Sequence, residues 1–232
     1  MGKTMIRTLV MILFLLSACT KVDVSVHRGV EEGLPPLRCN PNKLLLEVDS
    51  HPQETGAWCW VASAQTILDY HGIGKANEQC DFVTQSRGDK FQGASNNARF
   101  CCQKAINVNV ESRDTFKKVC QTGGWPEEVF GKSNPPISST RTEKYHVLTW
   151  DALRHQLCEF GPFIYAVEWS HGGIHTGVVS GYHTTQVQGS EKFVDVDEHY
   201  GAGFLVIPYE TFVRDPGTHT HYLDIIDIQP IF

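Results

Sequence analysis

The sequence predicts an α+β protein, with a helical N-terminal half packed on an antiparallel β-sheet half. Two amphipathic helical patterns lie before residue 161, and the chain then changes to short β-prone runs separated by turn residues. Helices first and strands second are typical of this fold class. With 232 residues, of which 41% are hydrophobic, the chain is long enough to form a sizeable core.

Residues 1–18 have the pattern of an export signal. Lys3 and Arg7 give a positive start, and the apolar run from Thr8 to Leu16 is too short to span a bilayer. The following LSAC, which ends at Cys19, resembles the bacterial lipobox, in which the signal is removed and the cysteine is acylated. The resemblance implies a lipoprotein. Thr20, rather than aspartate, follows the cysteine, which resembles the signal for sorting to the outer membrane of a Gram-negative cell envelope. An ordinary signal peptide with a cysteine nearby is the alternative.

The charge balance argues against a nucleic-acid partner. The chain has a net charge of −6, and residues 1–18 hold two of its 20 basic residues and none of its 26 acidic ones. Without that segment the net charge is −8, which disfavours binding to phosphate backbones and to anionic lipid. We therefore expect membrane attachment through a lipid on Cys19.

The remaining chain reads as a tether and one domain. Residues 19–38 are polar, contain glycine and two prolines, and are expected to join the lipid to a domain formed by residues 39–232. A short apolar run follows at residues 43–48. Apolar residues then recur at helical spacing from Cys59 to His71, and Gly72 provides the end signal.

Later elements follow from similar signals. Pro126 with two glutamates favours a helix start, residues 132–142 read as a loop, and residues 149–160 form a helical pattern ended by Gly161-Pro162. The β-prone runs are residues 163–169, 175–182, 193–196, 203–206 and 222–228.

The eight cysteines leave an odd number for pairing. If Cys19 carries lipid, seven remain in an oxidising compartment, so three disulfides and one free thiol are expected. Cys101 and Cys102 are neighbours and should bond different partners, such as Cys80 and Cys120. We expect the disulfides to staple the helical half and to leave Cys59 reduced. The cysteines expected to pair are Cys39, Cys80, Cys101, Cys102, Cys120 and Cys158.

Metal-binding patterns are weak in this chain, and we expect no metal or other cofactor. The cysteines include no C-x-x-C pair, which structural zinc sites use. His219-x-His221 could lie on one strand face, but we interpret this segment as the surface of an edge strand.

Cys59 has the surroundings of a nucleophile. It lies between two tryptophans where a loop becomes a helix, and a helix N-terminus lowers a thiol pKa. His175, in a glycine-rich segment before an apolar strand, is the candidate base. Asp197, with Asp195 as the alternative, is the candidate acceptor that orients the imidazole. Gln53 is the candidate side-chain donor to an oxyanion, beside the Cys59 N–H.

These residues resemble the motifs of papain-like cysteine peptidases, especially the small bacterial branch with staphopains, bacteriocin-leader peptidases and plant-pathogen effector proteases. The match consists of Gln53 six residues before Cys59-Trp60, then His175 followed by Gly181-Tyr182, then Asp197, and covers about residues 43–215. Bacterial relatives often have proline after that aspartate, where this chain has Glu198. Long inhibitory propeptides of the family have no counterpart here.

The resemblance implies a papain-like fold and a thiol peptidase. Cys59 matches the nucleophile, His175 the base and acid, Asp197 the orienting residue and Gln53 the oxyanion donor, with a peptide or protein as substrate. Two alternatives stay open. One is a cell-wall amidase or peptidase, or an amide transferase, on a related Cys-His core, and the other is an inactive binding lipoprotein. The flanking Trp58 and Trp60 either shape the cleft or are core aromatics.

Overall fold

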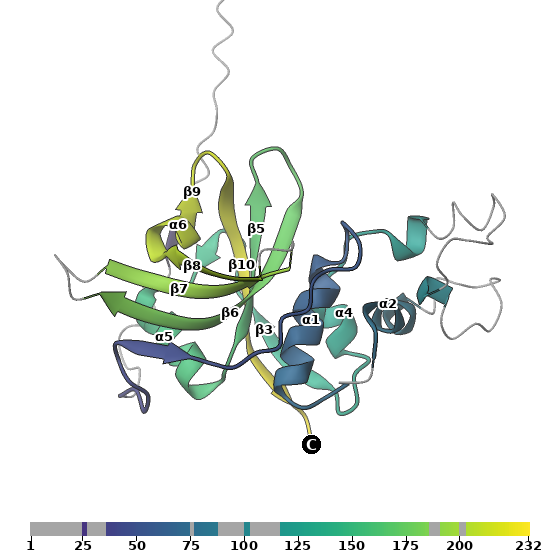
Figure 1. Ribbon diagram of the computed structural model, residues 1–232, viewed down its shortest axis with the longest axis horizontal. Helices are drawn as coiled ribbons and strands as arrows, with labels where there is room; N and C mark the ends of the chain where they lie inside the picture. The colour runs from purple at the N-terminus through teal and green to yellow at the C-terminus, as the bar shows by residue number, and fades with distance from the viewer. Residues whose placement is uncertain are drawn as a thin grey trace, which may run out of the picture.

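The computed structural model describes residues 25–26, 36–74, 77–87, 100–102, 117–185, 191–199 and 203–232. Residues 1–18 and the proposed lipidation site Cys19 lie outside the described residues. The helical segments are α1 (Cys59–Tyr70), α2 (Gln79–Arg87), the 3-10 turn η2 (Phe100–Cys102), α4 (Pro126–Phe130), α5 (Trp150–Glu159) and α6 (Tyr209–Val213). Figure 1 shows α1, α2 and α4 side by side at one side of the sheet. The α+β class expected from the sequence is confirmed.

An eight-stranded sheet forms the other half of the molecule, and its main path has the order β3-β10-β5-β6-β7-β8. The pairs along this path are antiparallel, and β2 joins β6 while β9 joins β10. Separately, β1 pairs with β4 in parallel. The strands are β1 (Ser25–Val26), β2 (Lys43–Leu45), β3 (Ile137–Arg141), β4 (His146–Val147), β5 (Phe163–Trp169), β6 (Ile174–Thr185), β7 (Glu191–Glu198), β8 (Gly203–Pro208), β9 (Arg214–Asp215) and β10 (His219–Pro230).

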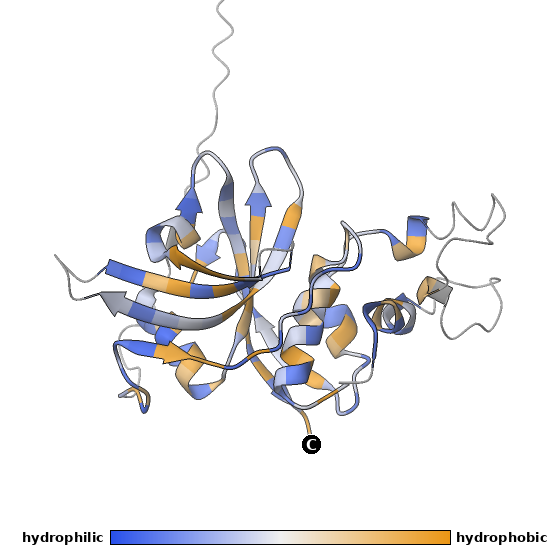
Figure 2. Cartoon of the chain, viewed as in Figure 1, coloured by the Kyte–Doolittle hydropathy of each residue, from blue (hydrophilic) through white to orange (hydrophobic). Residues whose placement is uncertain are grey.

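Strand β5 is apolar on both faces because it separates two hydrophobic clusters. Successive side chains of a strand point to opposite faces. Ile164 and Ala166 therefore pack with α1 in one cluster, whereas Phe163, Tyr165 and Val167 belong to the other cluster, with α5 and α6. Figure 2 shows hydrophobic residues along α1 and the strands that face it. The two clusters therefore pack α1 on one face of the sheet and α5 and α6 on the other face.

Helix α1 ends as the sequence predicts. Gly72 has φ +73°, a left-handed conformation that glycine adopts without a Cβ penalty. Its N–H donates to the Asp69 carbonyl at 2.9 Å, and the Ile73 N–H donates to the Leu68 carbonyl at 2.8 Å. This pair of bonds is the Schellman arrangement, which satisfies the last carbonyls of a helix. Helix α5 is capped at its N-terminus by Thr149, whose hydroxyl accepts a hydrogen bond from the Ala152 N–H.

Two expectations about the sheet are wrong. Residues 132–142 are not entirely a loop, since β3 forms there and pairs with β10 at the edge of the main path. Its polar ISSTR sequence hid it, because an edge strand needs few apolar side chains. His219 and His221 lie on β10 and pair with Trp169 and Val167 of β5, while β9 pairs with His219 on the other side. His221 is fully buried, and its Nε2 lies 3.0 Å from Oδ1 of Asp224.

Both tryptophans beside Cys59 are core residues. Trp58 and Trp60 are 2% and 1% exposed, and the Trp58 indole N–H donates to the Cys120 carbonyl. The Arg87 guanidinium lies 4.7 Å from the centre of the Trp60 ring and donates to the carbonyls of Val119 and Gly123. The start of α1 is thus anchored to α2 and to the segment before α4.

The disulfides confirm three pairs and one free thiol among the described cysteines. Cys80 bonds Cys102 and Cys101 bonds Cys120, so the neighbouring cysteines have different partners. The third bond joins Cys39 to Cys158 of α5. The expectation that all three staple the helical half is therefore wrong, since α5 packs on the sheet half.

Thiol counting checks this arrangement in solution. For a chain that begins at residue 20, and so lacks Cys19, we expect one reactive thiol under native conditions, because Cys59 is the free cysteine of the described part. Quantitative alkylation followed by peptide mass spectrometry should place that label on Cys59. Two stable free thiols, or a label on any of the six paired cysteines, would contradict the arrangement.

Candidate active site

Cys59 is the first residue of α1, and its thiol is partly exposed. The first N–H groups of an α-helix have no intrahelical acceptor, so a group placed there meets backbone donors and a positive potential. The loop before the helix is fixed by a bond from the Trp58 N–H to the Thr55 carbonyl, 3.1 Å long. The local chain therefore presents the sulfur where a thiolate is stabilised.

Strand β6 brings His175 to the start of α1. Thr176 Oγ1 lies 3.1 Å from Oγ of Ser63, one turn after Cys59 on α1. The Cys59 sulfur hydrogen-bonds with the His175 imidazole and with the backbone and side chain of Thr176. The structure therefore brings together the nucleophile and base expected from the sequence. It adds Thr176, for which the sequence offered no signal.

The two groups shift each other's pKa toward an ion pair. Burial raises the pKa of the Cys59 thiol, but the hydrogen bond and charge of His175, with a smaller contribution from Thr176, outweigh it and lower that pKa. Burial lowers the pKa of His175, but its hydrogen bonds with Cys59 and Glu198 raise it to about 9. The two shifts together favour a thiolate and an imidazolium over a neutral thiol and a neutral imidazole.

Glu198, not Asp197, contacts the imidazole of His175. The His175 Nε2 lies 2.8 Å from Oε2 of Glu198, which leaves Nδ1 as the ring nitrogen available to Cys59. The other carboxylate oxygen accepts from the Tyr165 hydroxyl. Burial raises the pKa of Glu198, but the hydrogen bond and charge of His175 outweigh this effect and lower that pKa below its ordinary value. The carboxylate is therefore ionised beside the imidazolium.

Strand periodicity explains why the neighbouring carboxylate is used. Val178 lies opposite Asp197 on β7, so the register continues with Gly177 opposite Glu198. Side chains two apart share a face, which puts His175, Gly177 and Glu198 on one face and Asp197 on the other. Gly177 has no side chain, and a Cβ there would lie 2.7 Å from the Tyr165 ring. The glycine leaves room for the diagonal contact between His175 and Glu198.

The two aspartates expected from the sequence have other contacts. Asp197 is fully buried and accepts from Oγ of Ser50 at 2.5 Å, and its second oxygen lies 3.5 Å from Nδ1 of His199. Asp195, the alternative, lies 3.4 Å from Nδ1 of His183, further along β6. Asp197 and Asp195 therefore contact Ser50 and His183, and the carboxylate that lies against the His175 imidazole is that of Glu198.

Gln53 lies in the loop that leads to Cys59. Its backbone N–H donates to the His199 carbonyl at 3.0 Å, and its side-chain Nε2 donates to the Thr55 carbonyl at 2.8 Å. Nε2 carries two hydrogens, so one N–H remains beyond the bond to Thr55. Its Oε1 is buried without a hydrogen-bond partner among the described residues.

An aromatic ring lies beside the imidazole of His175. The Trp169 ring centre lies 5.9 Å from that of His175, at an interplanar angle of 34°. Tyr165 packs behind Glu198, and burial with the charge of Glu198 raises the Tyr165 pKa well above its ordinary value, so its hydroxyl remains a donor. Low polarity around the pair strengthens its electrostatic interaction. The β-prone run ending in Trp169 was a sequence signal for the strand, but not for this contact.

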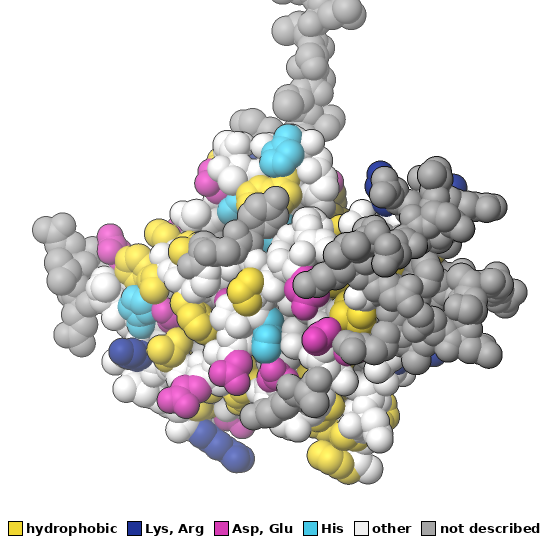
Figure 3. Space-filling model, turned by 45° about the vertical axis from the view of Figure 1, so that its right-hand side comes forward, with side chains coloured by type: hydrophobic (Ala, Val, Ile, Leu, Met, Phe, Trp, Pro, Cys, Tyr) yellow, Lys and Arg dark blue, Asp and Glu magenta, His cyan; other side chains and the backbone are white. Residues whose placement is uncertain are grey.

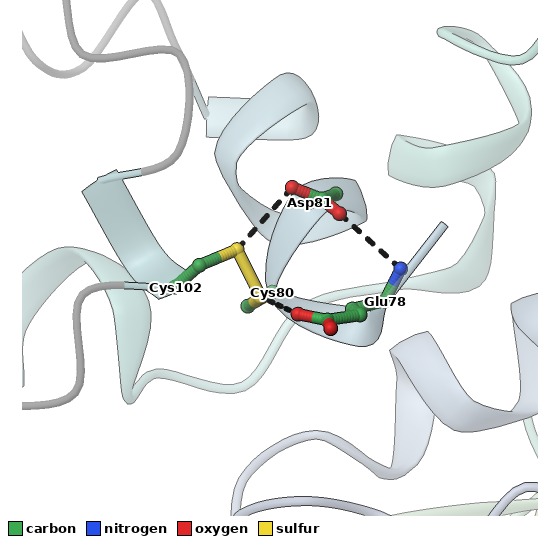
Figure 4. Close-up of side chains that lie close together, drawn as sticks. All are labelled: Glu78, Cys80, Asp81 and Cys102. Atoms are coloured by element: carbon green, nitrogen blue, oxygen red, sulfur yellow. Dashed lines mark hydrogen bonds between the residues drawn. A yellow bond between two sulfur atoms is a disulfide. The ribbon is translucent and has the colours of Figure 1, made fainter. Parts of the chain in front are cut away.

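A second cluster of polar side chains lies at α2 (Figure 4). Ligand-type atoms of Glu78, Cys80, Asp81 and Cys102 lie within 4.8 Å of one another, a spacing that suits a metal ion. The two sulfurs are bonded to each other, however, and a disulfide sulfur is not the thiolate that binds zinc. In this oxidised form the cluster is a disulfide flanked by carboxylates.

Comparisons with models of protein families and with curated proteins found no match to this chain. Among the described residues, no helix has both the length and the hydrophobicity needed to cross a bilayer. The class of site is therefore defined by its geometry. A thiol at a helix N-terminus is paired with an imidazole whose other ring nitrogen contacts a carboxylate.

Proposed function

We propose that this chain is a papain-like thiol peptidase, attached to the cell envelope by a lipid on Cys19. The observation that carries the proposal is the contact of Cys59 with His175, whose other ring nitrogen bonds Glu198 at 2.8 Å. Nucleophile, base and orienting acceptor in that order are the arrangement that activates a thiol for acyl transfer.

The residues act in a defined sequence. The Cys59 thiolate attacks the peptide carbonyl carbon, and the carbonyl oxygen becomes an oxyanion near the Cys59 N–H and Gln53 Nε2. His175 gives its proton to the departing amine as the C–N bond breaks, leaving a thioester on Cys59. The neutral imidazole then takes a proton from water, which attacks the thioester. Collapse of the second oxyanion releases the acid and restores the thiolate.

An apolar cavity beside Glu198 supports a substrate with a hydrophobic side chain. Its volume is about 250 Å³, and it lies between strands β5 and β8 and helix α6. Concave apolar sites with a few polar groups are typical of ligand binding. The apolar and aromatic lining includes Val167, Trp169, Leu205, Ile207 and Phe212.

The surface charge favours peptide over nucleic acid. The face drawn in Figure 3 has Asp and Glu side chains across its middle, while Lys and Arg lie near its margins. The net charge of −6 has the same sign. Phosphate backbones are bound by clustered basic side chains, which this face does not present in its described part.

Labelling with an epoxide inhibitor of thiol peptidases tests the proposal. We expect stoichiometric modification of Cys59 near neutral pH, found by peptide mass spectrometry, because the thiolate is the reactive form. Parallel assays with fluorogenic peptides and with muropeptides distinguish peptidase from cell-wall hydrolase. A protein that neither reacts with the epoxide nor cleaves peptides would contradict the proposal and favour the inactive binding lipoprotein.

A further inference from the structure

The end of β7 is joined to the loop that carries Gln53. The Ser50 hydroxyl donates to Oδ1 of Asp197 at 2.5 Å, and the Gln53 backbone N–H donates to the His199 carbonyl at 3.0 Å. We call these four residues, Ser50, Gln53, Asp197 and His199, the clasp. It joins positions that are more than 140 residues apart in the sequence.

Burial makes the Ser50 bond important to Asp197. Asp197 is 0% exposed and His199 is 1% exposed. A buried carboxylate is unfavourable unless hydrogen bonds replace its water. The second oxygen of Asp197 is buried without a hydrogen-bond partner in the described part of the chain, and it lies 3.5 Å from Nδ1 of His199. The Ser50 hydroxyl is therefore the strong contact of this carboxylate, and the carboxylate in turn holds Ser50.

The clasp is continuous with the start of α1. Beyond its backbone bond to His199, Gln53 donates from Nε2 to the Thr55 carbonyl at 2.8 Å. The same carbonyl accepts the N–H of Trp58, the residue before Cys59. A line of hydrogen bonds therefore runs from Asp197 through residues 50–55 to the catalytic helix. Donors to an oxyanion are effective only when they are held in place before the reaction.

We propose that Asp197 is a positioning residue for the oxyanion site, which it acts on through Ser50 and Gln53. This inference rests on the proposed peptidase function. Asp197 and Glu198 would then have separate tasks on opposite faces of β7: Glu198 orients the base, and Asp197 holds the loop of the oxyanion donor.

The test compares Ser50→Ala and Asp197→Ala with Gln53→Ala in the full chain. Gln53→Ala should lower kcat by about 10²-fold, as expected for one oxyanion donor. Ser50→Ala and Asp197→Ala should lower kcat by about 10-fold or more with little change in KM. Affinity for a peptide aldehyde, whose adduct with Cys59 carries an oxyanion, should fall by a similar factor. Adding Ser50→Ala to Gln53→Ala should cost little more, because both act on one donor.

Alkylation by iodoacetamide separates this role from an effect on His175, since it reports the thiolate–imidazolium pair and needs no oxyanion. Its rate and pH profile should match wild type in Ser50→Ala and Asp197→Ala. Asp195→Asn is the matched control, because Asp195 lies two residues earlier on β7 and contacts His183 instead. A changed alkylation profile, or losses that multiply in the Ser50→Ala/Gln53→Ala double variant, would overturn the proposal.

Hydrogen–deuterium exchange decides the role of the clasp independently of activity. Peptides that cover residues 51–57 should exchange faster in Ser50→Ala and Asp197→Ala than in wild type or Asp195→Asn. Unchanged exchange in both variants would overturn the inference. Faster exchange in a protein that cleaves no peptide would retain the clasp while rejecting the proposed function. Ser50→Ala keeps the test decisive if Asp197→Ala does not fold.

Discussion

Replacing Cys59 or His175 by alanine should remove nearly all peptide hydrolysis, with a loss in kcat of about 10⁴-fold or more. Neither residue can take over the role of the other, because the thiolate forms the acyl bond and the imidazolium supplies the proton. For the same reason, the double variant should be hardly worse than either single one. The measurement is kcat on a fluorogenic peptide, with residual activity checked against a preparation treated with the epoxide inhibitor.

A matched control for this loss is His183→Ala. His183 is a second histidine of β6, but it stacks on Phe193 and contacts Asp195 rather than Cys59. We expect this variant to retain wild-type kcat and KM. Circular dichroism and the melting temperature should show that Cys59→Ala and His175→Ala remain folded. Full hydrolysis by folded Cys59→Ala would end the thiol-peptidase proposal.

Glu198→Ala should lower kcat/KM by about 10²-fold and narrow the pH range of activity from its alkaline side. Activity requires the ion pair, which exists above the lowered pKa of Cys59 and below the His175 pKa of about 9. Glu198 raises the His175 pKa through a hydrogen bond and its charge, so removing the carboxylate lowers that pKa. The alkaline limb of kcat/KM should therefore move to lower pH.

Glu198→Gln refines this prediction. Glutamine still accepts a hydrogen bond from Nε2 of His175 but carries no charge, so we expect a smaller loss of rate and a similar shift of the alkaline limb. The pH dependence of iodoacetamide alkylation should show the same shift, since it follows the same ion pair. An unmoved limb in Glu198→Gln, together with a moved limb in Asp197→Asn, would restore Asp197 as the residue that orients the base.

Much of the fold could be predicted from local signals. The period of apolar residues identifies α1, Gly72 marks its end, and β-prone runs locate β5, β6, β7, β8 and β10. Strand β3 was missed because its stability comes from pairing with β10, a contact far away in the sequence. Cysteine counting indicated three disulfides and the free Cys59, but the partner of each cysteine depends on tertiary structure.

The third site residue illustrates how far pattern reasoning extends. Val194 and Val196 are buried in one cluster, so alternation within β7 already separates Glu198 from Asp197. Choosing between them also requires the register with β6, and an irregularity between Val179 and Gly181 shifts that register. A one-residue shift exchanges the two faces of a strand. The motif therefore located the segment, while the residue that meets His175 depends on strand pairing.

The bond between Cys39 and Cys158 determines where mechanical load enters the domain. If the chain is anchored at Cys19, any pull on the protein arrives along residues 19–38. At Cys39 that pull passes through a covalent link into α5, which packs on the face of the sheet away from α1. The loop from residue 50 to the start of α1 lies beyond this link and carries little of the tension. In a tethered molecule, tension from the anchor can thus act on the domain while the distance between Cys59 and His175 stays the same.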